Sequence, residues 1–79
     1  MRIKWDREAD AVEISLIPDD ERLHGIAQDS VTFEDVAEET GISALHSLVL
    51  DFDREGMLIG IEVLAPRQTL RESTLRDAT

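Results

Sequence analysis

The chain has 79 residues, of which 42% are hydrophobic and none is cysteine, and its 18 acidic and 8 basic side chains give a formal charge of −10. This length suits one small domain over residues 1–79 with a limited core, and the lack of cysteine excludes disulfide bonds and thiolate metal sites. The negative charge disfavours nucleic acid as a partner and favours a basic protein.

Two short alternating runs, residues 1–5 and 11–17, predict an antiparallel hairpin at the start of the chain. The polar stretch between them holds Asp6, Glu8 and Asp10, which we interpret as structural residues of the turn. In particular, we expect the carboxylates of Glu8 and Asp10 to accept hydrogen bonds from backbone N–H groups of that turn and to fix the register of the hairpin.

The middle of the chain gives a weaker pattern. Residues 26–33 predict a third strand, although hydrophobic and polar side chains alternate poorly there. Thr32 can instead begin a short helix, in which case Gly41 ends it. We favour a strand to about residue 33, followed by a helical turn or a loop, so that residues 34–45 stay open between helix and loop.

Alternating residues 45–52 and 57–64 predict a second hairpin, rich in β-branched side chains. Gly56 lies where the turn between the strands needs a positive φ. Gly60, in the middle of the second strand, allows a neighbouring group to approach closely, and we expect Trp5 to lie across it.

Residues 66–76 predict a short helix or tail, with Pro66 in its first turn. Its large apolar residues are Leu70 and Leu75, so we expect loose docking. The predicted fold is mainly β (α+β): a single antiparallel sheet of four or five strands in meander order with a short C-terminal helix. Because residues 57–64 are apolar on both sides, we also expect a second copy to close one face of the sheet as a homodimer.

The carboxylates near the second turn allow an alternative interpretation. In a calcium-binding EF-hand loop, the first, third, fifth, sixth and twelfth positions would fall on Asp51, Asp53, Glu55, Gly56 and Glu62. The flanking residues are typical of strands and not of helices, so we interpret Asp51 and Asp53, with Gly56, as structural residues of the turn. A divalent-cation or small-ligand site at Asp51, Asp53 and Glu55 remains the alternative.

Catalysis and DNA binding find little support. His24 and His46 are the only imidazoles, and the sequence contains no nucleophile or phosphate-loop motif, so we expect no enzyme and no cofactor. Residues 33–50 resemble the start of a helix-turn-helix. Their second part, residues 43–50, contains no Lys, Arg, Asn or Gln to contact phosphates or base edges.

Two segments, residues 5–14 and 50–64, carry a family resemblance. The first reads Trp-Asp-Arg-Glu-Ala-Asp-Ala, and the second reads Asp-Phe-Asp-Arg-Glu-Gly and closes on Gly-Ile-Glu. Together they resemble the bacterial domain-of-unknown-function family 2283. The resemblance implies a small β-rich domain without assigned catalytic residues. Family members often occur beside small toxin-like proteins, which implies an antitoxin or partner-binding activity.

We therefore expect a non-enzymatic protein–protein interaction module that binds a basic partner. No apolar stretch reaches the ~20 residues of a membrane span, and no signal-peptide pattern is present, so we expect a cytoplasmic protein that does not bind membranes. The acidic segment in the middle of the chain supplies the expected partner contacts, which are Asp29, Glu34, Asp35, Glu38 and Glu39.

Overall fold

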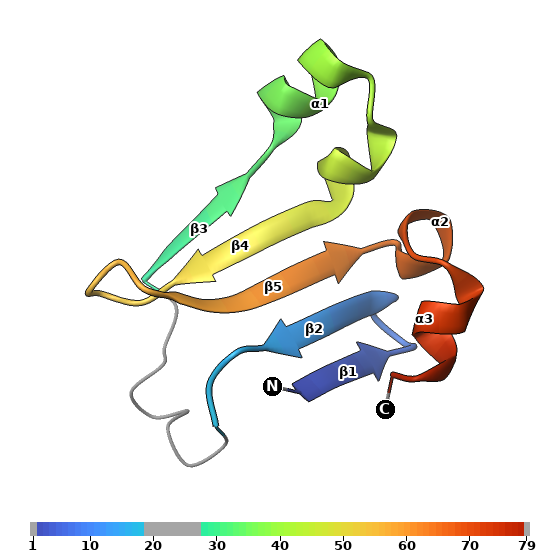
Figure 1. Cartoon of the computed structure of the whole chain (residues 1–79), viewed down its shortest axis with the longest axis horizontal. Helices are drawn as coiled ribbons and strands as arrows, with labels where there is room; N and C mark the ends of the chain where they lie inside the picture. Colours follow the sequence, from blue (N-terminus) through green and yellow to red (C-terminus); the bar gives the residue numbers. More distant parts are fainter. Residues whose placement is uncertain (1, 19–27, 79) are drawn as a thin grey trace.

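The computed structural model of the protein describes residues 2–18 and 28–78, which form an open five-stranded antiparallel sheet and short helices (Figure 1). The strands are β1 (Arg2–Asp6), β2 (Ala11–Ser15), β3 (Asp29–Thr32), β4 (Leu48–Phe52) and β5 (Leu58–Leu64). The helical elements are α1 (Glu34–Thr40), the 3-10 turn η2 (Ser43–Ser47), α2 (Pro66–Thr69) and α3 (Glu72–Arg76). The mainly β class and the single antiparallel sheet are thereby confirmed.

The strand order β1-β2-β5-β4-β3 shows that the predicted meander was wrong, because β2 pairs with β5 and not with β3. This pairing sets Val12 opposite Val63 and Ile14 opposite Ile61, so apolar side chains meet directly across the two strands. β3 instead forms an edge, where its four exposed residues pair with β4. β5 therefore lies in the centre of the sheet.

Several strands are shorter than predicted, including β4 and β2. The strand expected over residues 45–52 begins only at Leu48, because the preceding residues form η2, in which the Leu45 N–H donates to the Ile42 carbonyl at 3.1 Å. β2 ends at Ser15, although the Leu16 N–H still donates to the Ile59 carbonyl at 3.0 Å. Residues 26 and 27 of the expected third strand lie outside the described residues.

Residues 34–45, for which the sequence left helix and loop open, form a helix and then enter a 3-10 turn. Phe33, and not Thr32, precedes the first residue of α1. Gly41 ends α1 as predicted, because its φ of 72° is the left-handed conformation that glycine adopts at little cost, and its N–H donates to the Ala37 carbonyl. Among the described residues, no helix is long and apolar enough to cross a membrane.

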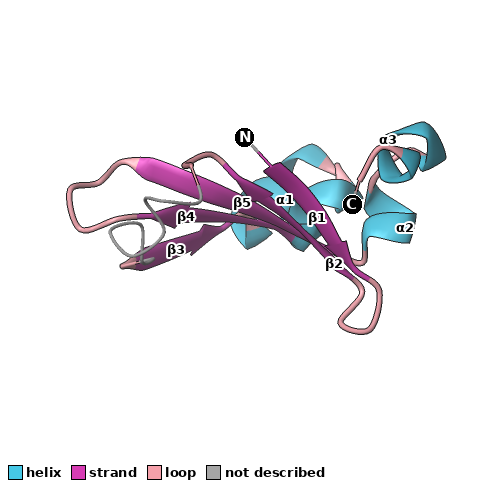
Figure 2. Cartoon of the chain, turned by 90° about the horizontal axis from the view of Figure 1, so that it is seen from below, coloured by secondary structure: helices cyan, strands magenta, loops and turns pink. Residues whose placement is uncertain are grey.

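The strand pairing divides the sheet into an apolar face and a polar face, since residues paired directly across two strands point to the same side. The apolar face carries Ile3, Trp5, Val12, Ile14, Val31, Leu48, Leu50, Ile61 and Val63. The polar face carries Lys4, Ala11, Glu13, Ser15, Ser30, Thr32, Val49, Asp51, Gly60, Glu62 and Leu64. Figure 2 shows the helices gathered toward one end, with the β4–β5 hairpin extending beyond them.

The core lies on the apolar face beneath the C-terminal helices. Val12 from β2, Val63 from β5 and Leu75 from α3 form its buried centre, and Leu70 packs against them. The expected loose docking of residues 66–76 was therefore wrong. The segment also forms two helices instead of one, because the backbone at Leu70 is extended between α2 and α3.

Candidate functional site

The carboxylates expected to bind a partner are mostly brought together on α1. Glu34, Asp35, Glu38 and Glu39 are exposed within this seven-residue helix, whose last turn contains no basic residue. Asp29 does not join them, because it begins β3 and pairs with Phe52 beside the β4–β5 turn. Four of the five residues therefore lie on one helix, and Asp29 lies apart from them.

Two apolar side chains accompany these carboxylates. Val36 is 42% exposed and Ile42 is 54% exposed. Thr40 links them through the backbone, since its hydroxyl donates to the Val36 carbonyl at 2.7 Å and accepts from the Ile42 N–H at 3.3 Å. We define the α1 surface by its exposed residues Glu34, Asp35, Val36, Glu38, Glu39 and Ile42.

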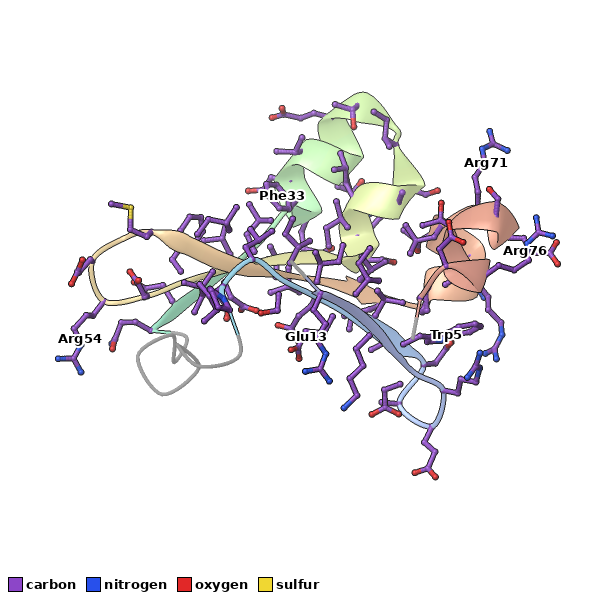
Figure 3. All side chains as sticks on the ribbon, turned by 60° about the horizontal axis from the view of Figure 1, so that its bottom comes forward. Trp5, Glu13, Phe33, Arg54, Arg71 and Arg76 are labelled. Atoms are coloured by element: carbon purple, nitrogen blue, oxygen red, sulfur yellow. The ribbon has the colours of Figure 1, made fainter. Side chains whose placement is uncertain are left out.

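The α1 surface is connected to the adjacent 3-10 turn by one side-chain contact. His46 Nδ1 lies 2.8 Å from Glu34 Oε2, and both side chains are partly exposed. The contact joins the first turn of α1 to η2 and leaves Glu38 and Glu39 outside it. In Figure 3, α1 stands above the sheet on the side of Phe33, whereas Glu13 lies on the opposite side. The α1 surface is thus separate from the polar face.

Backbone hydrogen bonds to one carboxylate and a left-handed glycine define the turn between β4 and β5. Asp53 Oδ1 accepts hydrogen bonds from the N–H groups of Glu55 at 2.9 Å and Met57 at 3.0 Å. Gly56 has a φ of 80°. Among the described residues, no group of three or more His, Asp or Glu side chains is arranged to hold a metal ion. The cation site at Asp51, Asp53 and Glu55 therefore has no support from the geometry.

Acidic side chains meet on the polar face. Glu13 and Glu62 are directly opposite each other on β2 and β5. Asp51 Oδ1 accepts a hydrogen bond from the Ser30 hydroxyl at 2.7 Å. The pKa of Glu62 is raised above its ordinary value by a hydrogen bond with Asp51, then by burial, and then by repulsion from Asp51 and Glu13. These neighbours and the burial therefore favour the protonated form of the Glu62 carboxyl.

The first turn is fixed by a different carboxylate from the two expected. Asp6 Oδ1 accepts from the N–H groups of Glu8 at 3.0 Å and Ala9 at 3.1 Å. Asp10 instead has a left-handed backbone, with a φ of 52°, and its Oδ1 accepts a hydrogen bond from Arg67 at 3.1 Å. Asp6 thus holds the turn, and Asp10 connects it to α2.

Gly60 and Trp5 lie on opposite faces of the sheet, so the expected contact between them was wrong. Gly60 is opposite Ser15 on the polar face, whereas Trp5 is opposite Val12 on the apolar face. A Cβ atom at Gly60 would lie 3.5 Å from the Ile14 carbonyl oxygen, which is an ordinary contact. The glycine is therefore not required by a close approach.

A basic pocket around Trp5 was not predicted from the sequence. Its volume is about 560 Å³, and we call it the Trp5 pocket; it is lined by Trp5, Arg7, Arg67, Leu70, Glu72, Leu75 and Arg76. The guanidinium carbons of Arg7 and Arg67 lie 4.4 Å and 4.9 Å from the centre of the Trp5 ring. In the sequence, the pocket is indicated only by the excess of arginine after residue 63. Arg7 joins these arginines only in the folded chain, when β1 and α3 are in place.

Comparison with known proteins identifies a family. A family described as "Protein of unknown function (DUF2283)" matches residues 2–65, which include all five strands. Neither the curated proteins nor the solved structures contain a match to this chain. The family match extends over most of the 79 residues, as the resemblance of the two quoted segments led us to expect. The chain is a member of the DUF2283 family.

Proposed function

We propose that this protein is a non-enzymatic protein–protein interaction module that binds a basic partner through the α1 surface. The observation that carries the proposal is the combination of exposed Val36 and Ile42 with the carboxylates of Asp35, Glu38 and Glu39. Apolar contacts supply affinity in protein interfaces, and charges around them speed association and select the partner. Capture of a basic toxin-like protein in the cytoplasm is one form that this function can take.

The proposal also fits the overall charge of the chain. With a formal charge of −10, the protein attracts basic proteins and repels acidic ones at distances up to about one Debye length, ~8 Å at physiological ionic strength. The alternative, a small ligand or cation bound at the β4–β5 turn, is less well supported, because Asp53 Oδ1 already accepts two backbone hydrogen bonds.

The test compares two charge-matched double variants. The first carries Glu38→Gln and Glu39→Gln on α1, and the control carries Glu8→Gln and Glu55→Gln in the two hairpin turns. Immobilised wild-type protein and both variants are exposed to lysate of the native host, and retained proteins are identified. Association rates of a purified candidate partner are then measured over a series of salt concentrations.

We expect a basic partner whose association slows as salt rises, and slows severalfold in the α1 double variant but not in the turn control. All three proteins should melt at nearly the same temperature, since exposed charges contribute little to stability. An acidic partner, or equal association rates for the two double variants, would show that α1 is not the binding surface.

We also infer that the protein forms a homodimer. Leu58 and Leu64, at the two ends of β5, are 39% and 45% exposed, and Met57 just before β5 is 63% exposed, so several apolar side chains stay uncovered in a single copy. Burial of such area is a common reason for symmetric pairing of small domains. Sedimentation at micromolar concentration should give the mass of two chains, and a monomer would exclude this assembly.

A further inference from the structure

We propose that the Trp5 pocket binds a small organic anion, with a carboxylate or phosphate group held by arginine guanidinium groups and an apolar body resting on Trp5, Leu70 and Leu75. The proposal is independent of the interaction proposed for α1, since no residue of the α1 surface lines this pocket. A volume of about 560 Å³ lies within the range of small-molecule sites in proteins, ~300–1,000 Å³.

The charge of the Trp5 pocket is opposite to that of the protein. Arg7, Arg67 and Arg76 line it, and these are three of only eight basic residues in a chain with 18 acidic ones. Glu72 is the one acidic lining residue. Three guanidinium groups near one cavity repel each other, and a bound anion offsets that repulsion. The pocket therefore favours an anionic ligand even though the protein as a whole repels anions.

The three arginines of the pocket differ in whether they already pair with a carboxylate of the protein. Arg67 donates to Asp10 at 3.1 Å, and its side chain is 57% exposed. Within residues 2–18 and 28–78, neither Arg7 nor Arg76 forms an ion pair with a carboxylate. Their guanidinium groups keep donors available for a ligand, and a guanidinium group can bind a carboxylate or phosphate through two parallel hydrogen bonds.

Trp5 adds a second indication of a ligand. Its indole Nε1–H is buried and has no hydrogen-bond partner among the residues that the structure describes. A buried donor without an acceptor is unfavourable, and such groups are rare in folded proteins. The donor is closed to solvent in this structure, so a ligand oxygen reaches it only if the ring shifts; the part of the ring that lines the pocket supplies apolar contact for the rest of the ligand. Leu70 and Leu75 extend that apolar surface.

The experiment uses three probes that share a phenyl ring: phenylacetate, phenyl phosphate and the uncharged control 2-phenylethanol. Trp5 is the only tryptophan and the chain has no tyrosine, so its fluorescence reports directly on the pocket. Calorimetric titration measures the same binding without relying on that fluorescence. We expect both anions to bind saturably and 2-phenylethanol to bind at least about tenfold more weakly, since a charged hydrogen bond contributes roughly that factor. The tighter anion identifies the preferred charged group.

Arginine variants locate the binding. Arg7→Gln and Arg76→Gln remove a guanidinium group from the pocket, whereas Arg71→Gln and Arg54→Gln remove the same charge outside it; Figure 3 labels Arg54, Arg71, Arg76 and Trp5. We expect each pocket variant to weaken anion binding about tenfold and each control to leave it unchanged. Thermal melting followed by circular dichroism verifies that every variant is folded.

Three results would overturn the proposal. The first is no saturable signal from either anion in calorimetry and fluorescence. The second is equal binding of 2-phenylethanol and the anions, which would make the pocket only an apolar hollow. The third is equal weakening by Arg76→Gln and by Arg54→Gln, which would show that the anion responds to overall charge and not to the pocket.

Discussion

Asp10 and Ala65 both have left-handed backbone conformations, with φ values of 52° and 46°, and the Ala65 N–H donates to the Asp10 carbonyl at 3.1 Å. They are the only non-glycine residues with positive φ in the described part of the chain. Their hydrogen bond joins the first turn to the start of α2, beside the contact between Asp10 and Arg67. Backbone strain is therefore concentrated at one corner, next to the Trp5 pocket.

Replacement of Ala65 with glycine should stabilise the protein by about 0.5 kcal/mol, because glycine removes the Cβ strain at positive φ while adding freedom to the unfolded chain. Thermal melting measures the change. Ala9→Gly is the control, since Ala9 lies in the first turn without a positive φ. It should be neutral or destabilising, and equal shifts for the two variants would contradict the assignment of strain to Ala65.

Gly56→Val should destabilise the protein by roughly 1–3 kcal/mol, because a β-branched side chain resists the φ of 80° observed at this turn. The cost is local to the backbone, since a Cβ atom here would meet no atom within 4 Å beyond the adjacent residues. Gly56→Asn should cost clearly less, because asparagine tolerates left-handed backbone. Chemical denaturation gives both values, and a melting temperature within a degree of wild type for Gly56→Val would place the turn elsewhere.

Leu75→Ala should cost about 2–5 kcal/mol, the usual range for truncating a buried leucine. Leu75 is 7% exposed in the core, beside Val12 and Val63. Leu64→Ala is the matched control, since Leu64 is 45% exposed, and it should cost much less. Equal losses in urea denaturation would mean that α3 does not close the core.

Glu62→Gln should stabilise the protein at neutral pH by about 0.2–1 kcal/mol, because it removes one of two like charges directly opposite each other on β2 and β5. Asp51 also faces Glu62, and Lys4 lies opposite Glu13 on β1. The pKa of Glu62 is raised in the folded state, so the folded protein binds this proton more tightly than the unfolded chain. Its stability contribution is therefore lost as the pH rises from the ordinary value of 4.5 through the raised pKa.

Melting temperatures across this pH range test the effect of Glu62. The advantage of Glu62→Gln should be small below pH 4.5, where the wild-type carboxyl is protonated in both states, and should grow to its full size above the raised pKa. Glu8→Gln, which alters an exposed carboxylate in the first turn, is the control. An advantage that is independent of pH would show that charge repulsion is not its cause.

Local patterns in the sequence predicted both hairpins, the left-handed Gly56 and the end of α1 at Gly41, because each depends on neighbouring residues. The strand order was missed because it depends on pairing between distant segments. The signal was present: residues 57–64 are apolar on both sides, as in a strand at the centre of a sheet. We used that pattern only to expect a dimer surface and not to place the strand at the centre of the sheet.

Among the candidate sites, the acidic α1 surface was predictable because its carboxylates are close in sequence. The Trp5 pocket was not, because Arg7 and Arg76 come from opposite ends of the chain and meet only in the folded protein. Among the described residues, the carboxylates of the metal alternative are not grouped to hold an ion, for a related reason. An EF-hand spacing places ligands together around a loop between helices, whereas in a hairpin the same spacing directs Glu62 along the strand, away from Asp53.

The core combines Ile3, near the start of the chain, with Leu75, near its end. During synthesis, the strands therefore leave the ribosome before the helix that covers their apolar face. Until residue 75 has emerged, the hydrophobic side of β2 and β5 is exposed to other nascent chains and to chaperones. Completion of the core consequently waits for residue 75 and does not proceed stepwise along the strands.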